Sequence, residues 1–171
     1  MILFILEMAV IFLLSKLLSC EGCAKCKICC SFDSYDLWET PIIADEKLEI
    51  IKREVSFPVD FVTLGGVRLL RLNREPDEDL YYCSLLDKEK GCLLGKNKPF
   101  ECSIWPLRVM RMENSRRVIT ISPVCPTVMK VPLSTLLEIA EELSPTIFRY
   151  SDISPEIIKP YLVGYPILIV E

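Results

Sequence analysis

The chain has 171 residues, of which 51% are hydrophobic, and this is enough apolar material for one packed domain or for a domain with an extension. It carries 20 Lys plus Arg against 24 Asp plus Glu, so no excess of basic residues favours nucleic acid as a partner. There is no histidine, which removes the commonest neutral metal ligand and the usual proton shuttle near neutral pH. Any metal in this protein must therefore be held mainly by thiolates.

The N-terminal segment, residues 1–19, is mostly apolar and is interrupted by Glu7, Ser15, Lys16 and Ser19. A membrane-spanning helix needs about 20 mostly apolar residues, and a charge near its centre, where Glu7 lies, is costly. We therefore prefer a hydrophobic helix of a cytoplasmic protein, and membrane association through this segment is the alternative. A signal peptide is disfavoured because no Lys or Arg opens the segment, although the sequence up to Cys20 resembles a lipobox.

Further along the chain, residues 45–54 are predicted to form a surface helix, because apolar residues recur at helical spacing and acidic residues occupy the first turn. Strands are predicted over residues 61–64, 67–72 and 80–86, which glycines and a polar stretch separate. Residues 108–112 and 117–121 are predicted to pair as a hairpin.

Residues 133–143 have the strongest helical pattern, with Ser134 as the predicted N-cap and Pro145 beyond the predicted end. A further helix over residues 153–161 and a strand over residues 166–170 complete the chain. The predicted fold class is α+β: a small, metal-organised cysteine-cluster domain with short strands, a hairpin and flanking helices. The predicted domains are an N-terminal hydrophobic helix (1–19), a cysteine-cluster metal-binding domain (20–131) and a C-terminal helical extension (132–171).

The cysteines carry the chemistry that the sequence predicts. Five of the nine lie in one eleven-residue ladder from Cys20 to Cys30, where the repeated Cys-x-x-Cys spacing lets a loop turn two sulfurs toward one cation. The other four lie in turn-like contexts. The predicted metal ligands are Cys23, Cys26, Cys29, Cys30, Cys83, Cys92, Cys102 and Cys125. Cys20 is left over as a lipidation candidate, an alternate ligand or a free thiol.

The order of these thiols resembles a known family. The relevant segments are Cys23-x-x-Cys26-x-x-Cys29-Cys30, Cys83, Gly91-Cys92, Lys98-Pro99-Phe100-Glu101-Cys102 and Cys125-Pro126. Together they resemble the YkgJ-like CxxCxxCC cysteine cluster proteins of bacteria and archaea. The resemblance spans about residues 23–126, and it implies binding of zinc or iron without implying a biochemical role. The chain has Lys98 and Ser103 where members of the family often have arginine.

The adjacent pair Cys29 and Cys30 predicts two metal sites, because neighbouring side chains in an extended segment point to opposite faces. One predicted site takes Cys23, Cys26, Cys29 and Cys125, and the other takes Cys30, Cys83, Cys92 and Cys102. The first set has the ligand spacing of a bacterial ferredoxin, so an iron–sulfur cluster is the preferred cofactor and Zn²⁺ is the alternative. Disulfides are disfavoured, since nine is an odd number and adjacent cysteines cross-link poorly.

The predicted function is that of a metal-binding protein whose iron–sulfur centre transfers electrons or senses redox state. A zinc-organised structural or binding module without catalytic activity is the alternative. Whether the chain is part of an oxidoreductase stays open, and no catalytic residue is assigned, because no phosphate-binding loop or catalytic triad is present. The arginines of the predicted hairpin are interpreted as a solvated face in preference to an anion-binding surface. The sequence identifies no protein partner.

Overall fold

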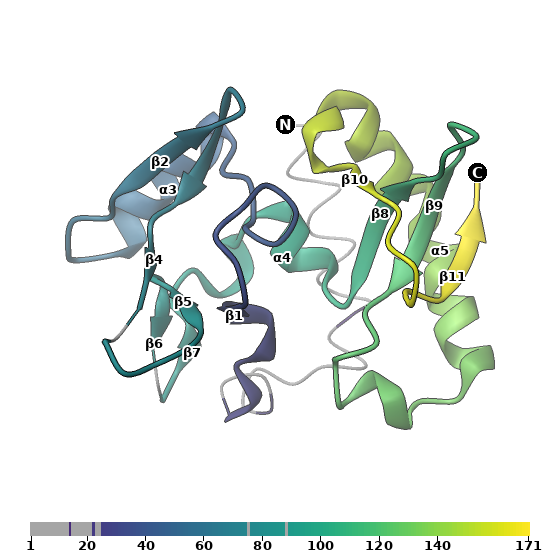
Figure 1. The fold of residues 1–171 in the computed structure, drawn as a ribbon, viewed down its shortest axis with the longest axis horizontal. Helices are drawn as coiled ribbons and strands as arrows, with labels where there is room; N and C mark the ends of the chain where they lie inside the picture. The colour runs from purple at the N-terminus through teal and green to yellow at the C-terminus, as the bar shows by residue number, and fades with distance from the viewer. Residues whose placement is uncertain (1–13, 15–21, 23–24, 75, 88) are drawn as a thin grey trace. The chain divides into compact units, whose positions relative to one another are not determined.

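The computed structural model describes residues 14, 22, 25–74, 76–87 and 89–171 (Figure 1). The chain divides into two compact units. The first, which we call the cysteine unit, spans Ser19–Cys102, and the second, the sheet unit, contains Ser103–Glu171 together with Leu14 of the N-terminal segment. Helices and short strands are mixed in the described residues, so the predicted α+β class is confirmed. The predicted domain boundaries stay predictions, because contacts alone do not show which part folds independently.

The described part of the cysteine unit contains small antiparallel sheets with the strand orders β1-β5-β4, β2-β3 and β6-β7. In the first of these sheets Ser31 pairs with Tyr82, and Phe32 pairs with Tyr81. The elements, in chain order, are the 3₁₀ turn η1 (Ile28–Cys30), β1 (Ser31–Phe32), α3 (Asp45–Glu54), β2 (Phe61–Leu64), β3 (Val67–Leu70), β4 (Leu72–Asn73), β5 (Tyr81–Cys83), β6 (Leu86–Asp87), β7 (Gly91–Cys92), the 3₁₀ turn η2 (Gly95–Asn97) and α4 (Phe100–Ile104), which ends just beyond the unit.

The predicted helix over residues 45–54 is confirmed as α3, and the first predicted strand is confirmed as β2. The two later strand predictions are too long. The stretch 67–72 breaks at Arg71, whose N–H donates to the carbonyl of Asp60, and the stretch 80–86 turns after Cys83. These breaks divide each predicted strand between two sheets, which an apolar sequence run does not reveal.

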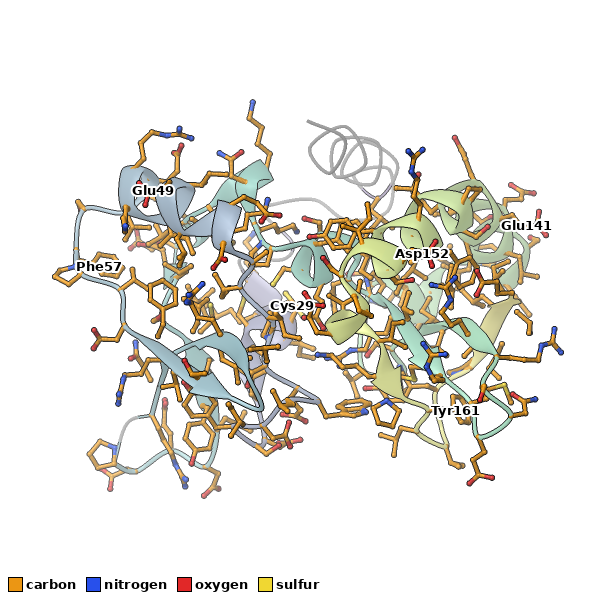
Figure 2. The ribbon with its side chains drawn as sticks, turned by 90° about the horizontal axis from the view of Figure 1, so that it is seen from above. Cys29, Glu49, Phe57, Glu141, Asp152 and Tyr161 are labelled. Carbon is orange, nitrogen blue, oxygen red and sulfur yellow. The ribbon has the colours of Figure 1, made fainter. Side chains whose placement is uncertain are left out.

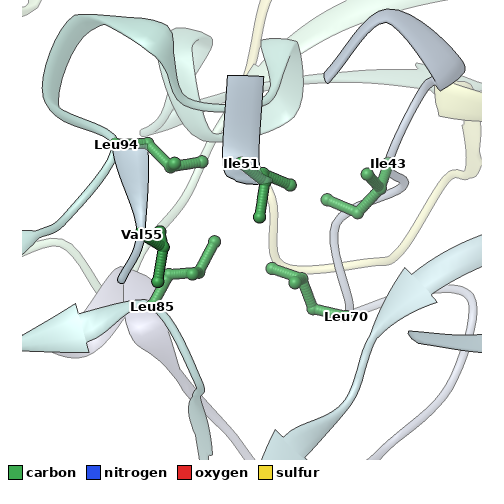
Figure 3. Packing of buried hydrophobic residues seen from close by; sticks show 6 residues of the cluster. All are labelled: Ile43, Ile51, Val55, Leu70, Leu85 and Leu94. Atoms are coloured by element: carbon green, nitrogen blue, oxygen red, sulfur yellow. The ribbon is translucent and has the colours of Figure 1, made fainter. Parts of the chain in front are cut away.

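A hydrophobic cluster forms the core of the cysteine unit (Figure 3). Its buried side chains point toward one another from α3 and from the strands and loops around it. They are Ile43, Ile51, Val55, Leu70, Leu85 and Leu94. Cys83 and Cys92 pack against this cluster while remaining partly exposed. The same apolar burial that stabilises the unit therefore fixes two of the cysteine-bearing segments.

The sheet unit is built on a hairpin of β8 (Leu107–Arg111) and β9 (Arg117–Ile121), which confirms the predicted hairpin. The sheet order is β10-β8-β9-β11, and α5 packs against β8 and β11. Buried apolar residues from the two central strands and from α5 form the core. The remaining elements are the 3₁₀ turn η3 (Val128–Lys130), α5 (Leu133–Ile153), the 3₁₀ turn η4 (Pro155–Ile157), β10 (Lys159–Pro160) and β11 (Ile167–Val170).

Helix α5 is longer than the predicted helix over residues 133–143, because it continues through Pro145. Proline lacks the N–H that would bond to the carbonyl of Glu141, but the hydroxyl of Ser144 donates to that carbonyl at 3.0 Å. The buried face also continues past the proline through Ile147 and Tyr150. The predicted N-cap is wrong as well: the residue before the helix is Pro132, and no side chain caps the first turn.

The predicted helix over residues 153–161 is also wrong. The segment forms η4 and then β10, which runs parallel to β8 and pairs Lys159 with Met110. Pro160 restricts the residue before it to extended conformations, which favours a strand over a continued helix. The predicted terminal strand is confirmed as β11. Within the described residues, no helix combines the length and the apolar composition needed to cross a membrane. Apart from Leu14, the segment 1–19 lies outside those residues.

Arg117 ties three elements of the sheet unit together. From β9 its guanidinium forms two ion-paired hydrogen bonds with the side chain of Glu171, at the end of the chain after β11. It also donates to Asp152 at 2.6 Å and to Ser151 Oγ at 2.8 Å, both on α5. The Arg117 side chain is only 14% exposed. Planar two-point pairing with a carboxylate is the geometry in which arginine contributes most to stability.

We therefore predict that Arg117→Met destabilises the sheet unit. The loss in the free energy of unfolding should be about 1–3 kcal/mol, because hydrogen bonds to charged groups are broken while the exposure of Asp152 and Glu171 limits the effect. Urea unfolding measures it. The matched control is Arg149→Met on the exposed side of α5, which should change stability by less than about 0.5 kcal/mol. Equal effects of the two substitutions would contradict the role assigned to Arg117.

Candidate metal centre

The adjacent thiols Cys29 and Cys30 lie in the 3₁₀ turn η1 (Cys29 is labelled in Figure 2). Lys27 begins the turn in a left-handed conformation, with φ of 58°, and its carbonyl accepts the N–H of Cys30 at 2.9 Å and the hydroxyl of Ser31 at 3.0 Å. Successive side chains on such a turn are separated by about 120° and not by the 180° of a strand. The two sulfurs consequently lie 3.9 Å apart. The prediction that they diverge is wrong, because it assumed an extended segment.

Cys83 joins this pair through the β1–β5 register. Since Ser31 lies opposite Tyr82, the next residue pair in the same register is Cys30 and Cys83. Residues directly opposite each other on antiparallel strands have side chains close enough to interact. Cys83 also contributes to the raised pKa of Cys30. A cysteine of the ladder is thus placed beside a cysteine more than fifty residues away in sequence.

Cys92 and Cys102 complete what we call the thiol cluster: Cys29, Cys30, Cys83, Cys92 and Cys102. Cys92 lies on β7, where it pairs with Leu86, and Cys102 lies on α4. The charges of Cys92, Cys30 and Cys29 contribute to the raised pKa of the Cys102 thiol. All five side chains are partly buried. They come from η1, β5, β7 and α4.

Burial and neighbouring thiols raise the pKa values of Cys29, Cys30, Cys92 and Cys102. Desolvation, followed by the charges of Cys92 and Cys30, raises the pKa of Cys102 well above its usual value, and desolvation likewise raises the pKa of Cys92. The pKa of Cys29 is raised by the hydrogen bond with Cys30 and by burial. For Cys30, the hydrogen bond with Cys29 lowers the pKa, but the hydrogen bond with Cys83 and burial outweigh it. Several thiolates could therefore coexist here only beside a compensating cation.

Lys98 is a functional candidate that the sequence reasoning used only as a departure from the family pattern. It lies in the loop that joins η2 to α4, and its charge lowers the pKa of Cys29, Cys92 and Cys102. The signal in the sequence is its position between two cysteines, directly before Pro99. Lys47 was missed altogether. It is 3% exposed on α3, and its Nζ donates to the carbonyl of Asn97 at 3.4 Å.

The other predicted ligands are placed differently or lie outside the described residues. Cys26 is exposed, Cys125 is buried in the sheet unit, and Cys20 and Cys23 are not among the described residues. Within the part of the chain that the structure describes, no group of three or more cysteine, aspartate or glutamate side chains is arranged to hold a metal ion as it stands. The eight-ligand set and its division into two sites therefore stay predictions.

Several arginines of both units make contacts within their own unit. Arg68 pairs with Asp45 at 2.5 Å, and Arg74 lies over the ring of Tyr81. In the sheet unit, the guanidinium carbon of Arg108 lies 5.4 Å from the centroid of the Trp105 ring. These contacts favour a structural role over an anion-binding role for these side chains.

Comparisons of the chain with protein-family models, with curated proteins and with solved structures give no match. The resemblance to YkgJ-like proteins rests on the cysteine pattern of this chain.

The burial of the thiol cluster predicts an order of thiol reactivity in the metal-free protein. A short pulse of iodoacetamide should label exposed Cys26 before Cys92 and Cys102, because alkylation needs both access and a thiolate. At any pH below the pKa of a thiol, its thiolate fraction increases about tenfold per pH unit. Because the pKa values of Cys92 and Cys102 are raised, their labelling should keep accelerating between about pH 8 and pH 10. Peptide mapping by mass spectrometry measures each rate. Equal rates for Cys26 and Cys102 would contradict the described burial.

Proposed function

We propose that this chain is a YkgJ-like CxxCxxCC protein whose cysteine unit binds a metal through the thiolates of the thiol cluster. The observation that carries the proposal is the Cys29–Cys30 pair, whose sulfurs lie 3.9 Å apart, with Cys83 opposite Cys30 in the β1–β5 register. Electrostatic interactions also link Cys30 to Cys92 and Cys102, which lie on β7 and α4 of the same unit. Free cysteines that only fill space behave as small apolar residues, and they have no reason to be gathered in one place.

The chemistry of the donor set fits a thiophilic metal. Thiolates are soft ligands that suit zinc and iron–sulfur clusters, whereas the hard cations Mg²⁺ and Ca²⁺ prefer oxygen. A bound cation would offset the repulsion between the ionised thiols, and Lys98 would offset part of the excess negative charge of a multi-thiolate centre. Since no three described ligands are arranged for coordination, metal binding would have to draw the sulfurs closer together.

An iron–sulfur centre that transfers electrons or senses redox state is our first form of the proposal. Its support is the sequence spacing of Cys23, Cys26 and Cys29, which resembles the ligand run of bacterial ferredoxins and ends at a residue of the thiol cluster. Such a centre would supply one-electron chemistry that no side chain of this protein supplies by itself.

A structural zinc ion is the second form, and a separate observation favours it. Cys83 and Cys92 pack against the hydrophobic cluster, at the ends of strands that belong to different small sheets. Two-stranded sheets are marginally stable alone. Zinc held by Cys30, Cys83, Cys92 and Cys102 would link these small sheets and stabilise the unit without catalysing a reaction, as structural zinc sites do.

Metal analysis of protein purified without oxygen tests both forms. Iron with acid-labile sulfide and a brown colour would support the first, and a colourless protein with stoichiometric zinc would support the second. Cys30→Ser and Cys83→Ser should each lower the metal content per chain, whereas the control Cys20→Ser should leave it unchanged. If the protein contains no metal and takes up neither zinc nor iron when reconstituted, the proposal is wrong.

Removal of the metal should loosen the cysteine unit more than the sheet unit. Structural metal can contribute about 10–16 kcal/mol to folding, which exceeds the ~5–15 kcal/mol net stability of typical domains. Hydrogen exchange after chelation should therefore rise in β5 and β7 and stay slow in α5. The proposal predicts this difference between segments of the same sample, so each unit serves as the control for the other. Unchanged exchange throughout the cysteine unit would contradict a structural role for the metal.

A further inference from the structure

The Cys29–Cys30 pair has a geometry of its own within the thiol cluster. The two sulfurs lie 3.9 Å apart on one turn, and both side chains are partly buried, so they remain within reach of a small molecule. We infer that this pair is a binding site for trivalent arsenicals that carry one organic substituent, such as an arylarsonous acid. The inference goes beyond the proposed function, because it needs two thiols and no metal ion.

The reaction is a condensation that uses only the groups named. An arylarsonous acid carries two hydroxyl groups on arsenic. Each of the two thiols forms one arsenic–sulfur bond as one arsenic–oxygen bond breaks, and each thiol proton leaves with a hydroxyl group as water. Arsenic keeps its trivalent state throughout, so no oxidant or reductant takes part. The product is an uncharged ring that contains the arsenic atom and both sulfurs.

The turn holds the two thiols in positions that favour formation of this ring. The hydrogen bond from Cys30 N–H to the carbonyl of Lys27 closes the turn, and the Ser31 hydroxyl bonds to the same carbonyl. The thiols are therefore held near each other before the arsenical arrives, and only rotation of the side chains is needed to bring the sulfurs together. Once the first bond forms, the second is intramolecular, and such linkage typically strengthens binding by about 10²–10⁴-fold.

The surroundings of the pair favour an uncharged product. Cys30 lies beside Cys83, and the charges of further cysteines act on it, so extra negative charge at this place is unfavourable. A divalent cation such as zinc needs four donors in its structural sites. No three described cysteine or carboxylate side chains are arranged to provide such a set. Two thiols complete the valence of an arsenical that already carries an aryl group, so the described pair suffices for it.

Phenylarsine oxide added to the reduced, metal-free full-length chain tests the inference. Intact-mass spectrometry should show one arsenical per chain with the loss of two titratable thiols, and peptide mapping should find the adduct bridging Cys29 and Cys30. Competition with dimercaptopropanol should show that Cys29→Ala and Cys30→Ala each weaken binding by about 100-fold or more, as expected from losing the intramolecular second bond. Cys26→Ala is the matched control, since Cys26 is an exposed cysteine of the same ladder, and its affinity should be unchanged.

An adduct that bridges other cysteines, or affinity that falls for Cys26→Ala and not for Cys30→Ala, would overturn the inference. The mapping on the unsubstituted chain keeps the test valid if a variant fails to fold. The outcome is also separable from the proposed function. Arsenical binding at this pair without metal uptake would leave the inference standing and remove the metal proposal, whereas metal uptake without arsenical binding would do the reverse.

Discussion

The register between β1 and β5 is the constraint on which the thiol cluster depends. It brings the end of the cysteine ladder opposite Cys83, and β5 in turn pairs with β4. The apolar residues that flank these short strands belong to the hydrophobic cluster, which also holds Cys92. A shift of one residue in this pairing would send the side chains of the shifted strand to the other face of the sheet and separate Cys30 from Cys83. The cluster is therefore a product of tertiary packing and not of the ladder alone.

The electrostatic environment of these thiols determines which ligands they favour. A protein core normally contains groups whose transfer out of water costs no free energy. Here it contains thiols whose ionised forms repel one another. The single ammonium of Lys98 relieves only part of that repulsion. Such a site favours ligands that either bring positive charge or leave the product neutral. A metal cation would meet this condition by its charge, and an arsenical would meet it by forming a neutral product.

Local patterns predicted much of the fold. Helix α3 followed from apolar spacing and an acidic first turn, and the β8–β9 hairpin followed from two apolar runs around a polar turn. The end of α5 does not follow from such a pattern, because proline normally ends a helix, and the Ser144 hydroxyl can compensate for Pro145 only in a helix that has already formed. At the site, sequence spacing predicted thiol ligands, and this stays a prediction. It gave the wrong relation between Cys29 and Cys30, since the left-handed Lys27 that starts their turn has no glycine to mark it.

The C-terminal segment has a further consequence for the sheet unit. After α5 the chain places β10 along one edge of the β8–β9 hairpin and β11 along the other. The two central strands are rich in buried Val, Ile and Met, the composition that pairs readily with other chains when a strand edge is open. β10 is only two residues long and contains Pro160, which cannot extend a ladder of hydrogen bonds. β10 and β11 thus cover both edges of the β8–β9 hairpin, so these two apolar strands present no open edge to another chain.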